Sequence, residues 1–183
     1  VDGQNNHQWA TTTPLLKRIL EESGRFTVAV STTPPGTPPA PRMAKGATPA
    51  QKAAHPDNLK KYAATEAEHA AKSPALWAKW HPKFSDYAVV ISNYNGERWP
   101  DAVRAAFVAY VQGGGGFVSY HAANNAFPEW PEYNEMIGVG GWGNRDEKSG
   151  PYLRLRAGRW IQDMAAGRGG SHGPQLEFVV EAQ

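Results

Sequence analysis

Two short apolar segments on either side of one helix-like segment limit most strongly what this chain can fold into. Residues 87–92 are a nearly continuous apolar run, which is typical of a strand buried on both faces. Residues 117–120 form a second short strand. Between them, apolar residues recur at helical spacing from Pro100 to the glycine run at Gly113. The order strand, helix, strand predicts two parallel strands with the helix packed against their sheet.

The N-terminal residues follow the same order. We expect Val1 to close a first strand, and a helix to open at Thr13 and Pro14 and to end at Gly24. β-Branched and aromatic side chains at 26–30 predict the next strand. The alternation predicts an α/β fold with a mostly parallel sheet and helices on both faces.

Residues 32–83 interrupt this alternation. Seven prolines between positions 34 and 56 prevent regular structure over much of the first part. Residues 58–80 are Ala-rich and predict a helix that breaks near Ser73 and Pro74. We interpret 32–83 as a Pro/Ala-rich insertion within a single domain that spans 1–183, since 183 residues suffice for one full core.

The C-terminal part of the chain predicts shorter elements. We expect a helix at 128–137, a strand at 152–156, a loop at 157–175 and a last strand at 176–180. The sequence stops within or just after that last strand, so we expect it to be truncated at its C-terminal end.

Composition excludes several classes of function. The chain has no cysteine, which excludes disulfides, thiolate metal sites and a cysteine nucleophile. Its formal net charge is only +2, so we expect no nucleic-acid partner. No apolar run approaches the roughly 18–20 residues of a membrane span. A cysteine-free chain slightly favours a periplasmic or secreted protein, although no signal peptide is visible in it.

Polar loops follow three of the predicted strands, at 2–9, 93–96 and 121–125. All three loops are rich in Asn, in His or in both. Ligands of parallel α/β sheets bind beyond the carboxyl ends of the strands. Three such loops in equivalent positions predict a polar pocket at one edge of the sheet.

His121 is the leading catalytic candidate. It follows the strand at 117–120 directly, on an abrupt turn where an imidazole could act as a general acid or base or bind a metal. The alternative is that it only hydrogen-bonds the turn. His7, in the first loop, is the second catalytic candidate, and a loop-stabilising role explains it equally well.

Amide and aromatic side chains are the candidates for substrate binding. Four asparagines could together hold the hydroxyls of a sugar, although each alone is typical of a turn. They are Asn93, Asn95, Asn124 and Asn125. Trp142 could stack on a sugar ring or pack on the core. Arg145 could contact the substrate or pair with Asp146.

A divalent metal such as zinc is a further candidate, with no cofactor certain. The residues that could hold it are His7, His121 and His172, because imidazole is a common ligand. No H-x-H or H-E-x-x-H spacing supports such a site. The acids nearest in sequence have the spacing of helix starts rather than of the carboxylate pair that glycosidases use; they are Glu97, Asp101 and Glu129.

Several motifs together resemble the trehalose-utilisation (ThuA-like) family. They are DGQNNH at 2–7, SNYNG at 92–96, GGGFV at 114–118, HAANN at 121–125, GW at 141–142 and HGP at 172–174. The resemblance covers most of the chain outside 32–83. It implies a flavodoxin-like sheet similar to that of class I glutamine amidotransferases. Amidotransferases carry a nucleophilic cysteine at the turn where this chain has His121, so amidotransferase activity is excluded.

The resemblance also implies a role in disaccharide metabolism, often through 3-keto sugars. We therefore expect an enzyme of the lyase, hydrolase or isomerase type that acts on a disaccharide, a glycoside or a keto-sugar. The alternative is a non-catalytic sugar-binding or scaffold module. The expected partner is a small carbohydrate, and a homo-oligomer is left open. The family usually continues into further His-containing segments beyond the point where this chain stops.

Overall fold

The computed structural model describes residues 1–138, 144–145, 151–169, 173–174, 176–177 and 179. The chain forms two compact units, Val1–Ala126 and Phe127–Gln183.

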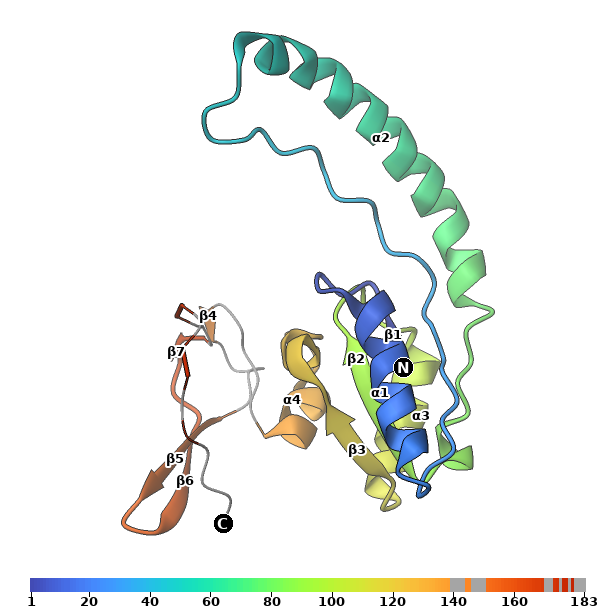
Figure 1. Ribbon diagram of the computed structural model, residues 1–183, viewed down its shortest axis with the longest axis vertical. Coiled ribbons are helices and arrows are strands. Elements are labelled where there is room, and N and C mark those ends of the chain that lie inside the picture. Colours follow the sequence, from blue (N-terminus) through green and yellow to red (C-terminus); the bar gives the residue numbers. More distant parts are fainter. Residues whose placement is uncertain (139–143, 146–150, 170–172, 175, 178, 180–183) are drawn as a thin grey trace. The chain divides into compact units, whose positions relative to one another are not determined.

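A parallel three-stranded sheet forms the centre of the first unit (Figure 1). Its strands are β1 (Asp2–Gly3), β2 (Val89–Tyr94) and β3 (Gly116–Ser119), in the order β1-β2-β3. β2 lies between the other two, with Asp2 opposite Asn93 and Val90 opposite Phe117. The predicted parallel α/β architecture is confirmed.

Helices lie on both faces of this sheet. Successive residues of β2 point to opposite faces, so neighbouring side chains contact different helices. The Asn93 side chain donates to the hydroxyls of Thr12 and Thr13 in α1 (Trp9–Glu22). Tyr94 contacts the Trp99 ring, which in turn contacts Phe107 of α3 (Asp101–Gln112). The helix predicted from Pro100 to Gly113 is therefore present, with both residues as its caps.

Aromatic side chains build the core between α3 and the sheet. Phe107 is fully buried, and its ring lies 5.0 Å from the rings of both Phe84 and Phe117. Phe84 belongs to the short 3-10 helix η1 (Phe84–Asp86). Trp99 is also buried and contacts Phe84 and Phe107. Edge-to-face and stacked ring pairs of this kind add to the free energy of burial.

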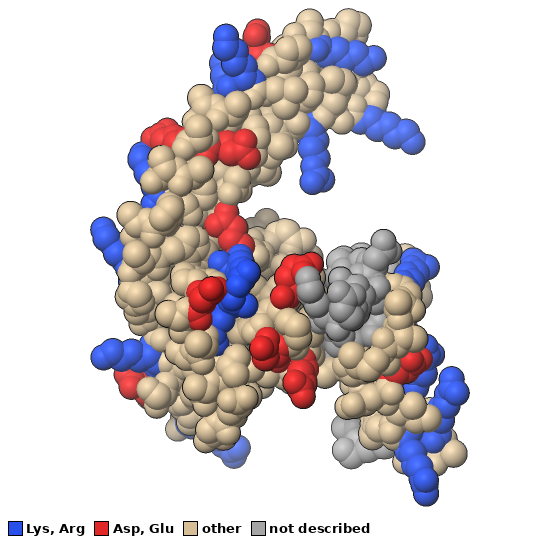
Figure 2. All heavy atoms as spheres, turned by 180° about the vertical axis from the view of Figure 1, so that it is seen from behind, with Lys and Arg blue, Asp and Glu red and all other residues tan. Residues whose placement is uncertain are grey.

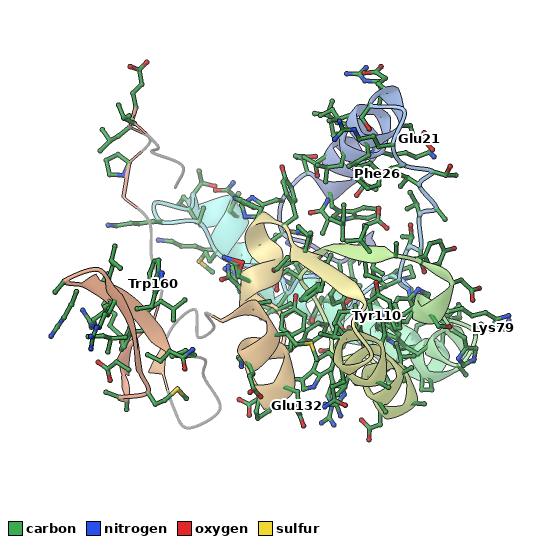
Figure 3. The ribbon with its side chains drawn as sticks, turned by 90° about the horizontal axis from the view of Figure 1, so that it is seen from below. Glu21, Phe26, Lys79, Tyr110, Glu132 and Trp160 are labelled. Carbon is green, nitrogen blue, oxygen red and sulfur yellow. The ribbon has the colours of Figure 1, made fainter. Side chains whose placement is uncertain are left out.

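The glycine run between α3 and β3 has a steric cause. Gly114 has a left-handed φ of 91°, and a side chain at Gly115 would overlap the ring of Tyr110. That ring packs over the turn, where its hydroxyl donates to the carbonyl of Gly116 at 2.9 Å. Tyr110 is labelled in Figure 3. The run therefore shapes a tight turn, as expected for a segment that precedes a strand.

The N-terminal helix and the segment after it differ from the prediction. α1 begins at Trp9, so Pro14 lies inside the helix rather than at its start. Residues 26–30 do not form a strand, and only Thr32 bridges to Asp2 of β1. Side chains of α1 take the backbone groups that a strand would need: Lys17 donates to the Val28 carbonyl, and the Val28 amide donates to Glu21. Figure 3 shows Glu21 and Phe26 at this end of α1.

The insertion contains one long helix, α2 (Pro49–Trp77), instead of a helix broken near Pro74. Thr48 and Gln51 form a capping box at its start, and an Ala-rich composition favours its interior. These contributions and the burial of Trp77 offset the roughly 3 kcal/mol that an interior proline costs. The 29 residues span roughly 44 Å.

Residues 34–47, which we call the strap, precede α2 and run alongside it in the opposite direction (Figure 1). His69 of α2 lies 3.0 Å from the carbonyl of Pro35 through Nε2. We call the strap and α2 together the arm. Figure 2 shows Lys and Arg side chains along the arm interspersed with Asp and Glu. Among the described residues, no helix is long and apolar enough to cross a membrane.

The second unit combines one helix with antiparallel strand pairs. α4 (Pro131–Ile137) ends at Gly138, with a φ of 68°, and packs Tyr133 against Phe127 and Trp130. β4 (Asn144–Arg145) pairs with β7 (Gly167–Arg168).

A β-hairpin completes this unit. β5 (Tyr152–Arg156), predicted as a strand, pairs with β6 (Arg159–Asp163) through a turn at Ala157 and Gly158. Both turn residues have positive φ, at 49° and 74°, as a two-residue type I′ turn requires. The prediction of a loop over 157–175 is therefore wrong, because it overlooked the Ala-Gly turn. Of the strand predicted at 176–180, the described residues are not in a strand. Trp160 is 71% exposed on the hairpin (Figure 3).

Candidate functional site

His121 lies at the carboxyl end of β3 in a left-handed conformation. Its φ is 51°, and it is the first residue of the 3-10 helix η2 (His121–Asn125). The Tyr120 amide donates to the Ser92 carbonyl at 2.9 Å, which keeps the chain against β2 up to the turn. A side chain in this conformation costs roughly 1–2 kcal/mol. Strained backbone conformations of this kind cluster at functional sites. The turn leaves the His121 side chain exposed.

The loop after β1 brings His7 against His121. The two ring centroids lie 4.3 Å apart with the ring planes at 80°, an edge-to-face contact. Both side chains are exposed. The His7 amide donates to Oδ1 of Asn5 at 2.9 Å, which fixes the turn that carries the ring. Two imidazoles 114 positions apart in the sequence therefore meet at one edge of the sheet, where parallel strands place ligand sites.

The buried side chain of Asn93 holds the loop that carries His7 in place. Its Nδ2 donates to Thr12 and Thr13 at 3.0 Å each, and its Oδ1 accepts from Nδ2 of Asn5 at 3.3 Å. Asn93 and Asn5 are both buried. The amide that was predicted to hold a sugar hydroxyl is thus engaged within the protein, and it connects the His7 loop to α1.

Removing this amide should destabilise the fold. We expect Asn93→Ala to lower the free energy of unfolding by about 1–3 kcal/mol, because buried polar partners are left unpaired. Urea denaturation followed by circular dichroism measures the change. As a control, Asn124→Ala alters an exposed side chain with no hydrogen bond to a described residue, and should change stability by less than about 0.5 kcal/mol. Equal losses in the two variants would contradict the role given to Asn93.

The other three asparagines lie in the segments that follow β2 and β3. Asn95 follows β2, and its Nδ2 donates to Oδ1 of Asn6 at 3.4 Å, so its loop contacts the His7 loop. Asn124 and Asn125 end η2, and neither side chain makes a hydrogen bond within the described part of the chain. Their amides are therefore available to a ligand, unlike that of Asn93.

The remaining candidates belong to the second unit. Arg145 lies in β4 opposite Gly167. Trp142 and His172 fall outside the described residues. Within the residues that are described, no group of three or more His, Cys, Asp or Glu side chains could hold a metal ion.

Gln4 and Glu97 are residues of the site region that sequence reasoning missed. Oε1 of Gln4 accepts from the Glu97 amide at 2.9 Å and from the Tyr94 hydroxyl at 3.2 Å. Glu97 accepts from the amide and hydroxyl of Thr37 in the strap. The available signal was the glycine next to each residue, Gly3 and Gly96, which indicates a close approach of two backbones.

The first unit contains a hollow beside α1. It has a volume of about 550 Å³ and lies between α1, residues 26–31 and β2. Its walls are mainly apolar, with Leu16, Phe26 and Ile91 among them. Neither His7 nor His121 lines it. Of the predicted site residues, Asn93 lines the hollow, but neither histidine does, so the hollow does not correspond to the polar pocket predicted from the loops.

One family model matches more than half of the chain, including β2, α3, β3 and the turn at His121. The model of the trehalose-utilisation family, ThuA, matches residues 44–170. The chain belongs to the ThuA family. The resemblance seen in the sequence motifs is thereby confirmed.

A solved structure supports membership of the ThuA family. It is the crystal structure of a ThuA-like protein from Parabacteroides merdae, which shares 37% sequence identity with this chain at a TM-score of 0.66. The alignment covers 94% of this chain and 48% of the other, so this chain spans about half the length of its relative. No curated protein matches the sequence.

Proposed function

We propose that this ThuA-family protein is an enzyme of carbohydrate metabolism that acts on a disaccharide, a glycoside or a keto-sugar. In this proposal the three-stranded sheet is part of a flavodoxin-like, amidotransferase-like fold, with His121 at the turn where amidotransferases place cysteine. One observation carries the proposal: two exposed imidazoles, His7 and His121, are in contact at the carboxyl edge of a parallel sheet.

A pair of imidazoles suits proton transfer near neutral pH, where histidine titrates. With a keto-sugar, neutral His121 would take a proton from the carbon next to the carbonyl and become an imidazolium, leaving an enolate. Protonated His7 would give its proton to a departing glycosidic oxygen in an elimination. In an isomerisation, the proton would instead return to the former carbonyl carbon, while the hydroxyl proton of the adjacent carbon moves to the former carbonyl oxygen, so that the keto group and the hydroxyl exchange places. Both steps use general acid–base catalysis and need no cysteine.

The amides of Asn95, Asn124 and Asn125 would bind sugar hydroxyls beside this pair. An amide offers both donors and an acceptor, which matches a hydroxyl. Asn93 has the structural role described above. Trp142 and Arg145 remain proposed contacts from the second unit.

A divalent metal such as zinc is a separate part of the proposal. His7 and His121 would supply two of its ligands, and a catalytic zinc site normally has three protein ligands. His172 is the proposed third ligand. The described residues alone do not complete the site, so the proton transfers above are derived without a metal.

Titration with sugars tests the proposal. We expect trehalose and its 3-keto derivative to shift the ring NMR signals of His7 and His121, and the keto-sugar to be consumed. A comparison with His55, which lies on the arm, controls for nonspecific effects. The proposal is wrong if neither sugar shifts the two ring signals and neither sugar is consumed.

The alternative is a non-catalytic sugar-binding or scaffold module. It is favoured by the absence of cysteine from the whole sequence, which leaves the strained turn without the nucleophile of amidotransferases. Ring shifts with both sugars but no consumption of either would support this alternative over the enzyme.

A further inference from the structure

We propose that the base of the arm sets the geometry of the histidine pair, through Gln4 and Glu97 acting as positioning residues. The insertion at 32–83 would then help to position the site residues, instead of being only an elaboration of the connection between two strands. The part of this inference that concerns ligand binding rests on the proposed function. The part that concerns geometry does not.

Gln4 joins three segments that are distant in sequence. It lies three residues before His7, directly after β1, with a left-handed φ of 50°. Its Nε2 donates to the Pro34 carbonyl of the strap at 2.7 Å. Its Oε1 accepts from the Tyr94 hydroxyl at the end of β2 and from the Glu97 amide in the loop after it. One half-buried amide therefore ties the His7 loop, the Asn95 loop and the strap together.

Two glycines make room for this side chain. A Cβ at Gly36 of the strap would lie 2.7 Å from Oε1 of Gln4. A Cβ at Gly96 would overlap the Cβ of Gln4 and lie 2.8 Å from the Tyr94 hydroxyl oxygen. Real Cβ atoms do not approach other atoms this closely. Gln4 is therefore packed between the strap and the loop after β2, and movement of either one must move it.

Glu97 forms the second link from the arm. Its Oε1 accepts from both the amide and the hydroxyl of Thr37, at 2.7 and 2.6 Å. Its Oε2 accepts from Nε1 of Trp77, the last residue of α2, at 3.4 Å. Partial burial opposes ionisation of this carboxyl, but these hydrogen bonds and the nearby His69 outweigh it and lower its pKa. Glu97 is thus held as a carboxylate between the strap, α2 and Gln4.

Through these hydrogen bonds the arm contacts both the loop that carries His7 and the loop that carries Asn95. Asn95 lies two residues before Glu97, and its amide meets Asn6 of the His7 loop. The strap reaches His7 through Gln4 and reaches Asn95 through Glu97. A shift at the arm base should therefore change the contact between the His7 and His121 rings. A purely structural arm would leave that contact unchanged.

Nuclear Overhauser effects between the ring protons of His7 and His121 report this contact directly in the unliganded chain. Gly36→Ala changes only the strap, and we expect it to abolish or strongly weaken the effect. Glu97→Ala should do the same, whereas Glu97→Gln keeps an oxygen that can accept from Thr37 and should restore most of it. Glu66→Gln is the matched control. It alters a carboxylate of α2 that accepts from Tyr62 of the same helix, and it should leave the effect unchanged.

A second readout is the affinity for trehalose, which we expect to fall about tenfold in Gly36→Ala and Glu97→Ala, equivalent to losing one good contact. If the ring contact persists in both variants, the inference is overturned, whatever happens to trehalose binding. If the ring contact is lost while trehalose binding is unchanged, the inference holds and the proposed function is contradicted. Should Gly36→Ala fail to fold, the comparison of Glu97→Ala with Glu97→Gln decides alone.

Discussion

Phe107→Ala is expected to lower the free energy of unfolding by about 3–5 kcal/mol, the largest stability effect that we predict. The ring is 0% exposed and contacts Phe84, Trp99 and Phe117. Its removal takes away buried apolar surface and leaves a cavity between rigid aromatic neighbours that cannot collapse fully. A loss of this size approaches the whole stability of a small domain. Guanidinium denaturation, or thermal unfolding if the variant is too unstable, measures it.

Phe26→Ala is the matched control, because it removes the same atoms from a side chain that is 47% exposed. We expect that variant to lose less than about 1 kcal/mol. Equal losses would mean that the cluster around Phe107 does not form the core. A loss confined to Phe107→Ala would show that the ring cluster between α3 and the sheet is the core of this unit.

The parallel sheet could be predicted because its signals are local. The apolar run before Ser92 and the glycine turn before Phe117 each identify a strand from neighbouring residues. The strand expected at 26–30 failed for a reason outside that segment. Its β-branched residues fit a strand, but Lys17 and Glu21 of α1 bond the backbone of Val28 instead. Such a competition between side chain and strand partner is set by tertiary contacts.

The arm shows the same limit. Pro56 was expected to precede the helix and Pro74 to break it, yet α2 passes through both. Each proline removes one hydrogen bond, and the remaining Ala-rich turns and the capping box at Thr48 keep the helix continuous. Helix breaks are therefore overestimated when each proline is considered alone and the stability of the whole 29-residue helix is not taken into account.

The site was predicted in part for a topological reason. Parallel strands place their carboxyl ends at one edge, so the loops that carry His7 and His121 had to lie near each other. The 4.3 Å contact between their rings could not be predicted, because it depends on the turns at Asn5 and at His121 itself. The burial of Asn93 could not be predicted either, since a helix was expected to open at Thr13, whereas α1 begins at Trp9 and contains both partners of Asn93, Thr12 and Thr13.

His121→Asn is expected to lower turnover of a keto-disaccharide by about 10²–10⁴-fold, the effect typical of losing a general acid or base. Asparagine is the substitution of choice because it tolerates the left-handed conformation that this position requires, with its φ of 51°. Alanine would add backbone strain and confuse loss of the imidazole with loss of the turn. The melting temperature of the asparagine variant should therefore stay close to that of the unaltered protein.

His55→Asn provides the control, since it makes the same chemical change on α2, outside the site. We expect it to retain full turnover. The measurement is the steady-state rate of keto-sugar consumption, with kcat separated from KM. A loss in kcat with KM nearly unchanged would place His121 in the chemical step, because an interaction made only in the transition state leaves ground-state binding intact. A change in KM alone would assign His121 to substrate binding rather than to the chemical step. Retention of full turnover by His121→Asn would remove His121 from the mechanism altogether.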